Sequence, residues 1–480
     1  MDVALQRDAV TDGADEDGER KALSRSASGA SMGSRKPSIA SFAAVLDGTD
    51  EAPNATLVRQ ALAAAIRGAT TGFVLKGGLS LASLLTKRKQ RHKTTTGAAA
   101  EDAVSALRYA AFLGVYASGY RIADTLLLTL LGERSRRWHA ALAGMLVAPS
   151  YRLASAQPSP SLSIYIALRA ALLTLRAEAT RNRPPLSTPA GRFLMQHGAT
   201  MTMSATASVL LHAWLLEPRA LESAYVKFLN LHGGKGRAIV DGVCEMARTP
   251  DGTASVVVPA VRDWHVANGT SLEALGAVVA GCDDPCALVH PGESHLGHAV
   301  RFAAQGVMRA LPVYLPVYAV STAMVQRANL LRKPKHVIQR AALGVLRSSL
   351  FLSAYCSLAW LSCCTVHHLP SKRRVTRRSV LLCTAPAGLA ALIEKPSRRT
   401  ELALFCAGHA CHSLARLAVL WGVAQPLPHA DLLLLTLSSG CIMDAYTHAP
   451  HTFRPAFRSV FTWIFGYSWR RKGSIQSLLY

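Results

Sequence analysis

Long apolar runs that alternate with short basic segments constrain this chain more than any other feature of its sequence. Two of them, 302–325 and 343–366, are each about 24 residues long and flank a basic hinge at 327–340. A helix of about 20 apolar residues spans the hydrocarbon core of a bilayer. The pattern predicts an all-α fold, a polytopic membrane helical bundle of roughly eight to ten spans. Further apolar segments lie at 61–85, 106–131, 138–155, 162–175, 193–216, 379–393, 401–423 and 430–446.

Composition and charge agree with a membrane protein. Half of the residues are hydrophobic and 17% are charged, and the mean hydropathy is +0.20, a combination that is unusual for soluble domains. The net charge is +24, with Lys and Arg clustered between the apolar runs, as at 87–93 and 372–378. Such loops suit anionic lipid headgroups, so membrane lipids are the expected partners. Since no nucleic-acid-binding motif accompanies the charge, we expect no nucleic-acid partner.

Five segments follow from the distribution of residue types. Residues 1–56 are polar and rich in Ser, Gly and Asp, which predicts a disordered tail. Two apolar regions, 60–232 and 300–465, flank a polar connector at 233–299 that carries Cys and His. A basic tail at 466–480 ends the chain.

The two apolar regions resemble each other in sequence. Phe112-Leu113-x-x-Tyr116 matches Phe351-Leu352-x-x-Tyr355. Pro218 matches Pro450, and Arg67 matches Arg309. These matches predict two tandem repeats of about four to five helices each, in parallel or inverted orientation, a layout in which transporters place the substrate site between the copies.

Charges within the apolar runs are the first group of candidate functional residues. Arg121 and Asp124 are three residues apart and therefore lie on one helix face, and Asp444 lies in the last long run. Charges at membrane depth either neutralise each other or line a polar path. We expect Arg121, Asp124 and Asp444 to line a substrate path if the second interpretation holds.

A cluster in the connector is the second candidate group. Cys282, Cys286, His290 and His295 lie close together in the sequence, and thiolate and imidazole are the usual ligands of zinc. Either these residues bind zinc, or they belong to a polar loop that caps the next helix; no other cofactor is expected. The cysteines within apolar runs, such as Cys364, are expected to be buried free thiols.

Enzyme motifs are missing from the chain. The sequence has no nucleophile elbow of the GxSxG type and no HExxH motif. Because no nucleophile–base pair can be recognised, we expect a non-enzymatic protein.

The C-terminal half carries a series of short motifs that point to a known family. They are Cys286-x-x-x-His290-Pro291-x-x-Ser294, Val313-Tyr314-Leu315-Pro316-Val317-Tyr318, Ser348-Ser349-Leu350-Phe351-Leu352, Glu394-Lys395-x-Ser397-Arg398-Arg399, Pro426-Leu427-Pro428-His429-Ala430-Asp431 and Arg454-Pro455. In these motifs the chain resembles the transmembrane protein 135 family of peroxisomal and mitochondrial membrane proteins. A fainter version lies in the first half, at Ala111-Phe112-Leu113-Gly114 and Pro218 to Phe228. One departure is that the family's cysteine-rich segment closes with Ser-Cys, whereas Ser294 here is followed by His295.

The resemblance implies residence in a peroxisomal or mitochondrial membrane and a part in lipid handling or organelle dynamics. We therefore expect a multi-pass organellar membrane protein in lipid transport or homeostasis. One alternative is a membrane scaffold that recruits division or tethering factors through its basic loops or its 1–56 tail. Another is a translocase-like channel subunit, because Gly68-x-x-x-Gly72 and Gly77-Gly78 in the first run are loosely similar to mitochondrial inner-membrane translocase subunits. Small residues at this spacing also predict that the helix of the first run approaches another helix closely. A homo-oligomer is compatible with all three.

Overall fold

The structure, a computed structural model, describes residues 53–87, 96–132, 137–154, 160–181, 184–325, 327–368 and 374–466. Contacts between residues divide the chain into 1–59 and 60–480, and of the first unit only the start of helix α3 is described. The predicted disordered tail at 1–56 and the predicted basic tail at 466–480 fall almost entirely outside the described residues.

The prediction of an all-α fold is confirmed for the described residues, where the extended pairing is limited to one bridge between Ala254 and Cys282. The helices of the first apolar region, with η for 3₁₀ helices, are α3 (Pro53–Lys87), α4 (Thr96–Leu131), α5 (His139–Val147), η4 (Ala148–Leu153), α6 (Pro160–Thr180), α7 (Pro189–Leu216), η5 (Pro218–Ala220) and α8 (Ser223–Gly233). The connector holds α9 (Arg237–Arg248), α10 (Val258–Ala267), η6 (Ala274–Ala277) and α11 (Pro285–Val289). The second apolar region holds α12 (His295–Val325), α13 (Arg327–Arg332), α14 (Pro334–His367), α15 (Arg377–Cys383), η7 (Ala385–Ile393), α16 (Pro396–Leu420), α17 (Ala430–His448), η8 (Pro450–Thr452) and α18 (Pro455–Phe465).

Three helices of the described part are long and apolar enough to cross a membrane. They are α7, α14 over Pro334–Thr365, and α16, which is consistent with an integral membrane protein but is fewer than the roughly eight to ten spans expected from the sequence. Two of the expected segments, 138–155 and 379–393, are instead each split into a short α-helix and a 3₁₀ helix. Pro149 and Pro386 lie at the start of these 3₁₀ helices, and proline cannot donate the hydrogen bond that would continue the preceding α-helix.

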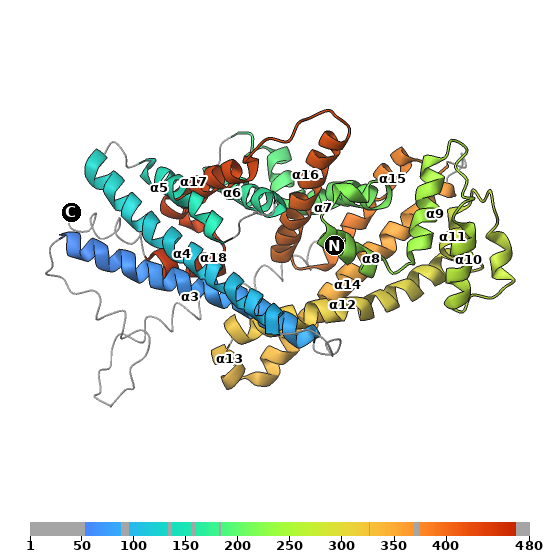
Figure 1. Cartoon of the computed structure of the whole chain (residues 1–480), viewed down its shortest axis with the longest axis horizontal. Coiled ribbons are helices and arrows are strands. Elements are labelled where there is room, and N and C mark those ends of the chain that lie inside the picture. Colours follow the sequence, from blue (N-terminus) through green and yellow to red (C-terminus); the bar gives the residue numbers. More distant parts are fainter. Residues whose placement is uncertain are drawn as a thin grey trace. The chain divides into compact units, whose positions relative to one another are not determined.

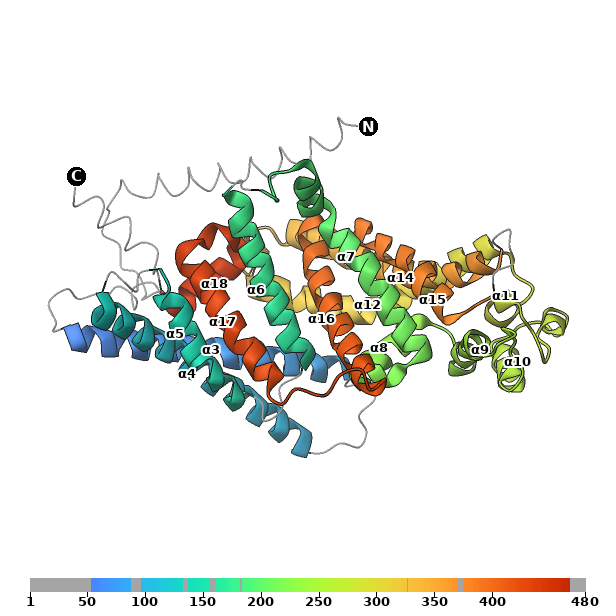
Figure 2. The same cartoon turned by 90° about the horizontal axis from the view of Figure 1, so that it is seen from above.

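Long helices pack in two arrangements within residues 60–480. Figure 2 shows α17, α6, α16 and α7 side by side in that order, and each neighbouring pair is in contact. The long helices α12 and α14 pack along each other, as Figure 1 shows. Helix α14 also packs against η7, just as α4 packs against η4.

The order of elements recurs along the chain. The series α4, α5, η4, α6, α7, η5 and α8 is followed in the second region by α14, α15, η7, α16, α17, η8 and α18, with long, short and 3₁₀ helices in the same places. The contacts are reciprocal: α7 packs on α16 and η7, while α17 packs on α6 and η4.

Small residues allow close helix contacts where the sequence predicts them. A Cβ atom at Gly68 would overlap the carbonyl of Leu113, and one at Gly72 would overlap that of Tyr109, so α3 and α4 approach closely at the predicted Gly68-x-x-x-Gly72 pattern. The prediction is confirmed there but not at Gly77-Gly78, where an added Cβ would meet nothing.

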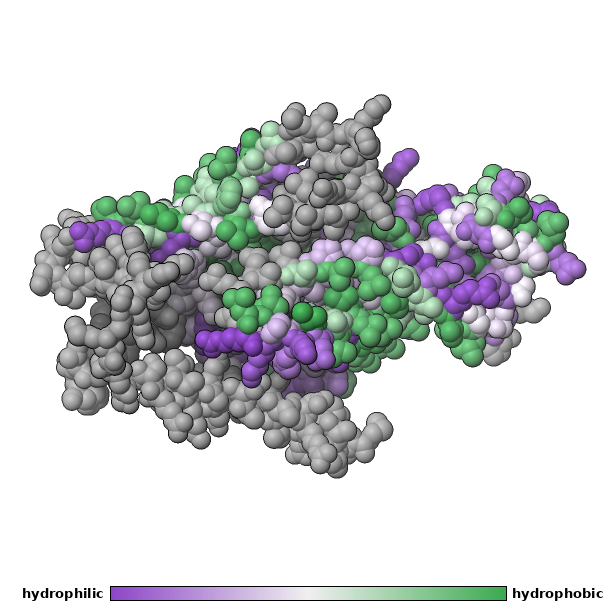
Figure 3. Space-filling model, turned by 90° about the horizontal axis from the view of Figure 1, so that it is seen from below, coloured by the Kyte–Doolittle hydropathy of each residue, from purple (hydrophilic) through white to green (hydrophobic). Residues whose placement is uncertain are grey.

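The surface separates an apolar region from a polar one. Figure 3 shows apolar side chains gathered in the middle of one face, while the end formed by the connector is more hydrophilic. Exposed apolar side chains recur along the candidate spans, among them Leu343, Leu346, Leu350, Phe405 and Leu414. Exposed apolar surface of this kind favours contact with a membrane.

Candidate metal centre and apolar cavity

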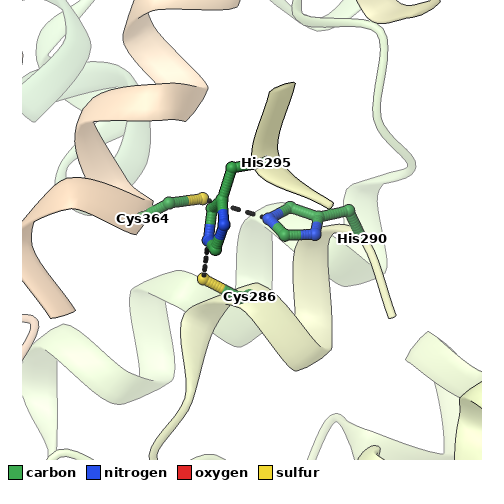
Figure 4. Close-up of side chains that lie close together, drawn as sticks. All are labelled: Cys286, His290, His295 and Cys364. Atoms are coloured by element: carbon green, nitrogen blue, oxygen red, sulfur yellow. Dashed lines mark hydrogen bonds between the residues drawn. The ribbon is translucent and has the colours of Figure 1, made fainter. Parts of the chain in front are cut away.

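Four Cys and His side chains from three helices meet where the connector touches α14. Cys286 lies on α11, His290 follows this helix directly, and His295 is the first residue of α12. Cys364 comes from the last turn of α14. Figure 4 shows the two imidazoles turned toward the two sulfur atoms.

Local sequence explains how the connector presents its three side chains. Pro285 begins α11, and the Asp284 side chain accepts a hydrogen bond from the Cys286 backbone N–H at 2.8 Å, which is a standard N-cap. After His290, Gly292 adopts a φ of 71°, a left-handed conformation that glycine takes without strain. The turn brings His295 back toward Cys286.

The distances within the group suit a metal ion. The four ligand atoms all lie within 4.8 Å of one another; Cys286 Sγ is 3.2 Å from His295 Nε2, and His290 Nε2 is 3.3 Å from Cys364 Sγ. Donor atoms of a tetrahedral zinc site are about 3.3–3.8 Å apart, given its bond lengths. His290 Nδ1 lies 3.2 Å from the Glu293 carbonyl, which fixes the ring as ligand imidazoles require. The group could therefore hold a metal ion.

The protonation of the Cys286 thiol depends on its burial and on the neighbouring Cys364 thiol. The interaction with Cys364, together with burial, raises the pKa of the Cys286 thiol well above its ordinary value. Cys286, His290 and Cys364 are buried, and His295 is half-buried. A bound cation would reverse this effect, because a metal stabilises the thiolate.

His368 is a fifth possible ligand at the edge of the group. Its Nε2 lies 3.1 Å from His295 Nε2 and 3.6 Å from Cys286 Sγ. Cys364 and His368 are four residues apart, and therefore lie on one face of the chain as it leaves α14. This spacing is the signal that sequence reasoning missed when it assigned Cys364 to the buried free thiols.

Three of the four metal ligands predicted from the sequence come together, and the fourth does not. Cys286, His290 and His295 belong to the group. Cys282 is a correction: its thiol donates to the Asp284 carbonyl at 3.4 Å, because its backbone is held in the bridge to Ala254 before α11 begins. Cys364 takes the fourth place. All ten cysteines are free thiols.

Each of the predicted path residues Asp124 and Asp444 pairs with a histidine, and these two histidines lie close together. Asp124, buried on α4, pairs with His139 Nδ1 at 2.5 Å. Asp444 pairs with His448 at 2.9 Å, and the rings of His139 and His448 are 6.0 Å apart. Neither histidine was predicted to be a path residue from the sequence. Arg121, the third predicted residue, donates to the Gln60 side chain at 2.6 Å.

An apolar cavity of about 130 Å³ lies among α7, α8, α12, α14 and α16. Its lining is aliphatic and aromatic, apart from Cys356, Cys406, His232 and the hydroxyl groups of three tyrosines. The lining includes Trp214, Tyr225, His232, Gly233, Cys356 and Trp360. Trp360 Nε1 donates to the Gly233 carbonyl at 2.8 Å, so α14 and α8 are joined at the cavity wall.

The cavity and the metal-ligand group are neighbours. Trp360 precedes Cys364 by four residues on α14, which is about 6 Å along a helix axis. A metal bound at the group would therefore tie the connector to α14 about one turn beyond the cavity.

No known family model matches the chain, and no solved structure matches it.

Proposed function

We propose that the chain is a non-enzymatic integral membrane protein that binds lipid-like molecules in its apolar cavity and takes part in lipid transport or homeostasis. The observation that carries the proposal is the cavity, because three of its walls belong to the candidate spans α7, α14 and α16. An apolar cavity of roughly 150 Å³ stays dry and takes up a molecule of benzene size. A cavity of about 130 Å³ can thus hold a segment of an acyl chain.

The proposed ligand can reach the cavity from a membrane. Exposed apolar side chains on α14 and α16, such as Leu350 and Phe405, offer a lipid-facing surface, and Phe405 also lines the cavity. Basic segments between the apolar runs suit anionic headgroups. The resemblance of the C-terminal half supports a peroxisomal or mitochondrial membrane, which fluorescent tagging with markers of both organelles would test.

In this proposal the Cys286, His290, His295 and Cys364 group holds a structural zinc ion. Two thiolates and two imidazoles are a donor set that favours zinc, and four protein ligands leave no open position for chemistry. The ion would hold the connector against α14 and so keep the cavity wall in place.

Two tandem modules are the second structural part of the proposal. The recurring order of elements and the reciprocal contacts support it, together with the sequence matches between the halves. Helices α6 and α16 then lie at the interface between the modules, where they contact each other.

The experiment measures the binding of an uncharged single-chain lipid. The full-length protein in phosphatidylcholine nanodiscs is titrated with radiolabelled oleyl alcohol, for the wild type and for Ala359→Phe and Ala342→Phe. Ala359 lines the cavity, whereas Ala342 is exposed on the same helix, so a Phe side chain should fill the cavity only in the first variant. We expect at least about tenfold weaker binding for Ala359→Phe and no change for Ala342→Phe. Equal effects of the two substitutions, or no saturable binding by the wild type, would refute the proposal.

A further inference from the structure

A guanidinium group with unsatisfied hydrogen-bond donors lies beside the cavity. The Nε and Nη2 atoms of Arg309, on α12, are buried and have no hydrogen-bond acceptor among the described residues. No ion pair joins Arg309 to a carboxylate in the described part of the chain. Arg309 as a whole is half-buried, but buried donors without an acceptor cost free energy, so proteins normally pair them.

The position of this group is fixed by its neighbours. The guanidinium lies over the Phe302 ring, 4.8 Å from its centroid. On another side it touches Gly234, where a Cβ atom would overlap it and where φ is 66°. Gly234 directly follows His232 and Gly233, which line the cavity. Arg309 is not itself a lining residue, and its guanidinium lies behind the part of the cavity wall that Gly233 forms.

A neutral imidazole and one further basic side chain lie near Arg309. The Nε2 atom of His232 is buried without a partner. Lys235 donates to the Val289 carbonyl at 2.7 Å and lies 5.9 Å from the Phe302 ring; burial lowers the pKa of this lysine to about 8. Glu293 acts on Lys235 but is paired with Arg301 at 2.7 Å. Among the described residues no carboxylate pairs with Arg309, although the second oxygen of Glu293, Oε2, is buried without a partner.

The two free atoms have the geometry of an anion site. Nε and Nη2 form one edge of the guanidinium, and their N–H groups point in parallel. This edge matches two oxygens of a carboxylate or a phosphate, which arginine binds in bidentate fashion. The matching residue of the first half, Arg67, is used differently: it donates to the Trp463 carbonyl and lies over the Trp463 ring.

We propose that the Nε–Nη2 edge of Arg309 is the headgroup subsite for an anionic single-chain amphiphile, whose chain lies in the adjacent apolar cavity. This inference rests on the proposed lipid binding and names its substrate class. The polar donors fix the headgroup, and the apolar walls take the first carbons of the chain.

The test compares ligands that share a chain and differ in headgroup. Full-length protein in phosphatidylcholine nanodiscs at pH 7.5 is loaded with radiolabelled oleyl alcohol, which is then displaced by oleate, by oleyl phosphate or by unlabelled oleyl alcohol. Acetate and inorganic phosphate, each added alone, report on anions without a chain. We expect the wild type to bind one or both anionic lipids at least about tenfold more tightly than oleyl alcohol, and acetate and phosphate not to displace the label.

Two substitutions of Arg309 and one control variant test whether Arg309 causes the preference for anionic lipids. Arg309→Gln should remove the preference for anions and leave the affinity for oleyl alcohol within about twofold, which also shows that the variant is folded. Arg309→Lys keeps the charge but lacks the bidentate edge, so the preference should fall to about threefold. Arg301→Gln, on the same helix but exposed and paired with Glu293, should behave as the wild type.

Each outcome decides the matter. A wild type that binds all three lipids equally, or an Arg309→Gln variant that keeps the preference, overturns the headgroup site while the proposed lipid binding stands. A wild type that does not bind oleyl alcohol overturns both. If Arg309→Gln loses every ligand by misfolding, Arg309→Lys decides, because an undiminished preference in that variant contradicts the role of the edge and a reduced one supports it.

Discussion

The interior between α4 and α18 and the interior between α14 and α8 are made from elements in the same order, yet one is filled and the other is hollow. In the first, Tyr116 and Tyr120 contact the Phe465 ring at 6.0 and 5.4 Å, and Phe461 packs against Phe465 at 5.6 Å. In the second, the corresponding space is part of the apolar cavity. Two regions with the same order of elements can therefore have different interiors.

Single positions explain much of this difference. The offset of 232 residues that takes Pro218 to Pro450 also takes Gly233 to Phe465, Leu229 to Phe461 and His232 to Ile464. Where the filled interior has an aromatic ring, the hollow one has a glycine whose carbonyl accepts from Trp360. At this position the Trp214 ring lies against Gly233 in place of an added side chain.

The largest expected effect concerns the metal-ligand group. This group lies beside the hollow interior, between α14 and α8, and not beside the filled one. Cys364→Ser should weaken zinc binding by about 1,000-fold, because it removes one of four ligands from a closed site. Zinc content per chain, measured by mass spectrometry after purification, should fall from about one to near zero. Cys282→Ser is the matched control and should keep its zinc; loss in Cys282→Ser together with retention in Cys364→Ser would contradict the assignment.

Truncation of a side chain should lower the free energy of unfolding more in the filled interior than beside the cavity. Phe465→Ala is expected to reduce the free energy of unfolding by about 3–5 kcal/mol, since it creates a new void among packed rings. Leu229→Ala, next to an existing cavity, should cost about 2 kcal/mol. Unfolding in detergent micelles, followed by tryptophan fluorescence, measures both. Equal losses would mean that the two interiors are packed alike.

The two acidic residues of the filled side should differ in importance. Asp124 is buried and paired with His139, so Asp124→Asn should cost about 2 kcal/mol of unfolding free energy. Asp444 is partly exposed, and its pair with His448 spans one helical turn; Asp444→Asn should cost only about 0.3 kcal/mol. The same unfolding measurement applies. A larger loss for Asp444 than for Asp124 would contradict the burial of the first pair.

The last expected effect is a dependence of stability on pH at His232. Burial lowers the pKa of His232 to about 4, below the value of about 6.5 for an unperturbed histidine. The unfolded chain therefore takes up a proton first, and the stability that neutral His232 provides is complete above pH 6.5 and is lost as the pH falls toward 4. Allowing for solvent screening, the loss should be about 1–2 kcal/mol. His232→Ile, which copies Ile464 of the filled interior, should lose that much less stability than the wild type between pH 7.5 and 4.5.

Sequence reasoning predicts the helical class, the membrane character and the close contact at Gly68 and Gly72, because each follows from residue spacing along one or two neighbouring helices. It also finds Cys286, His290 and His295, which lie within one short segment. It fails at Cys364, since a ligand that arrives from another helix is set by tertiary packing and not by local spacing. It fails likewise at His139, which pairs with Asp124 only after α4 and α5 have packed. His448 is different, because it lies four residues from Asp444 on the same helix, a spacing that can be read from the sequence.

The most direct measurement is a map of photo-crosslinks made by a photoactivatable, clickable oleyl alcohol in the membrane-embedded protein. A lipid-binding cavity predicts that labelled peptides come from α8 and from the Phe351–Trp360 part of α14, and that excess unlabelled oleyl alcohol removes the label. Label that falls equally on α4 and α18, or that the unlabelled alcohol fails to displace, would contradict a hollow interior that holds a lipid chain.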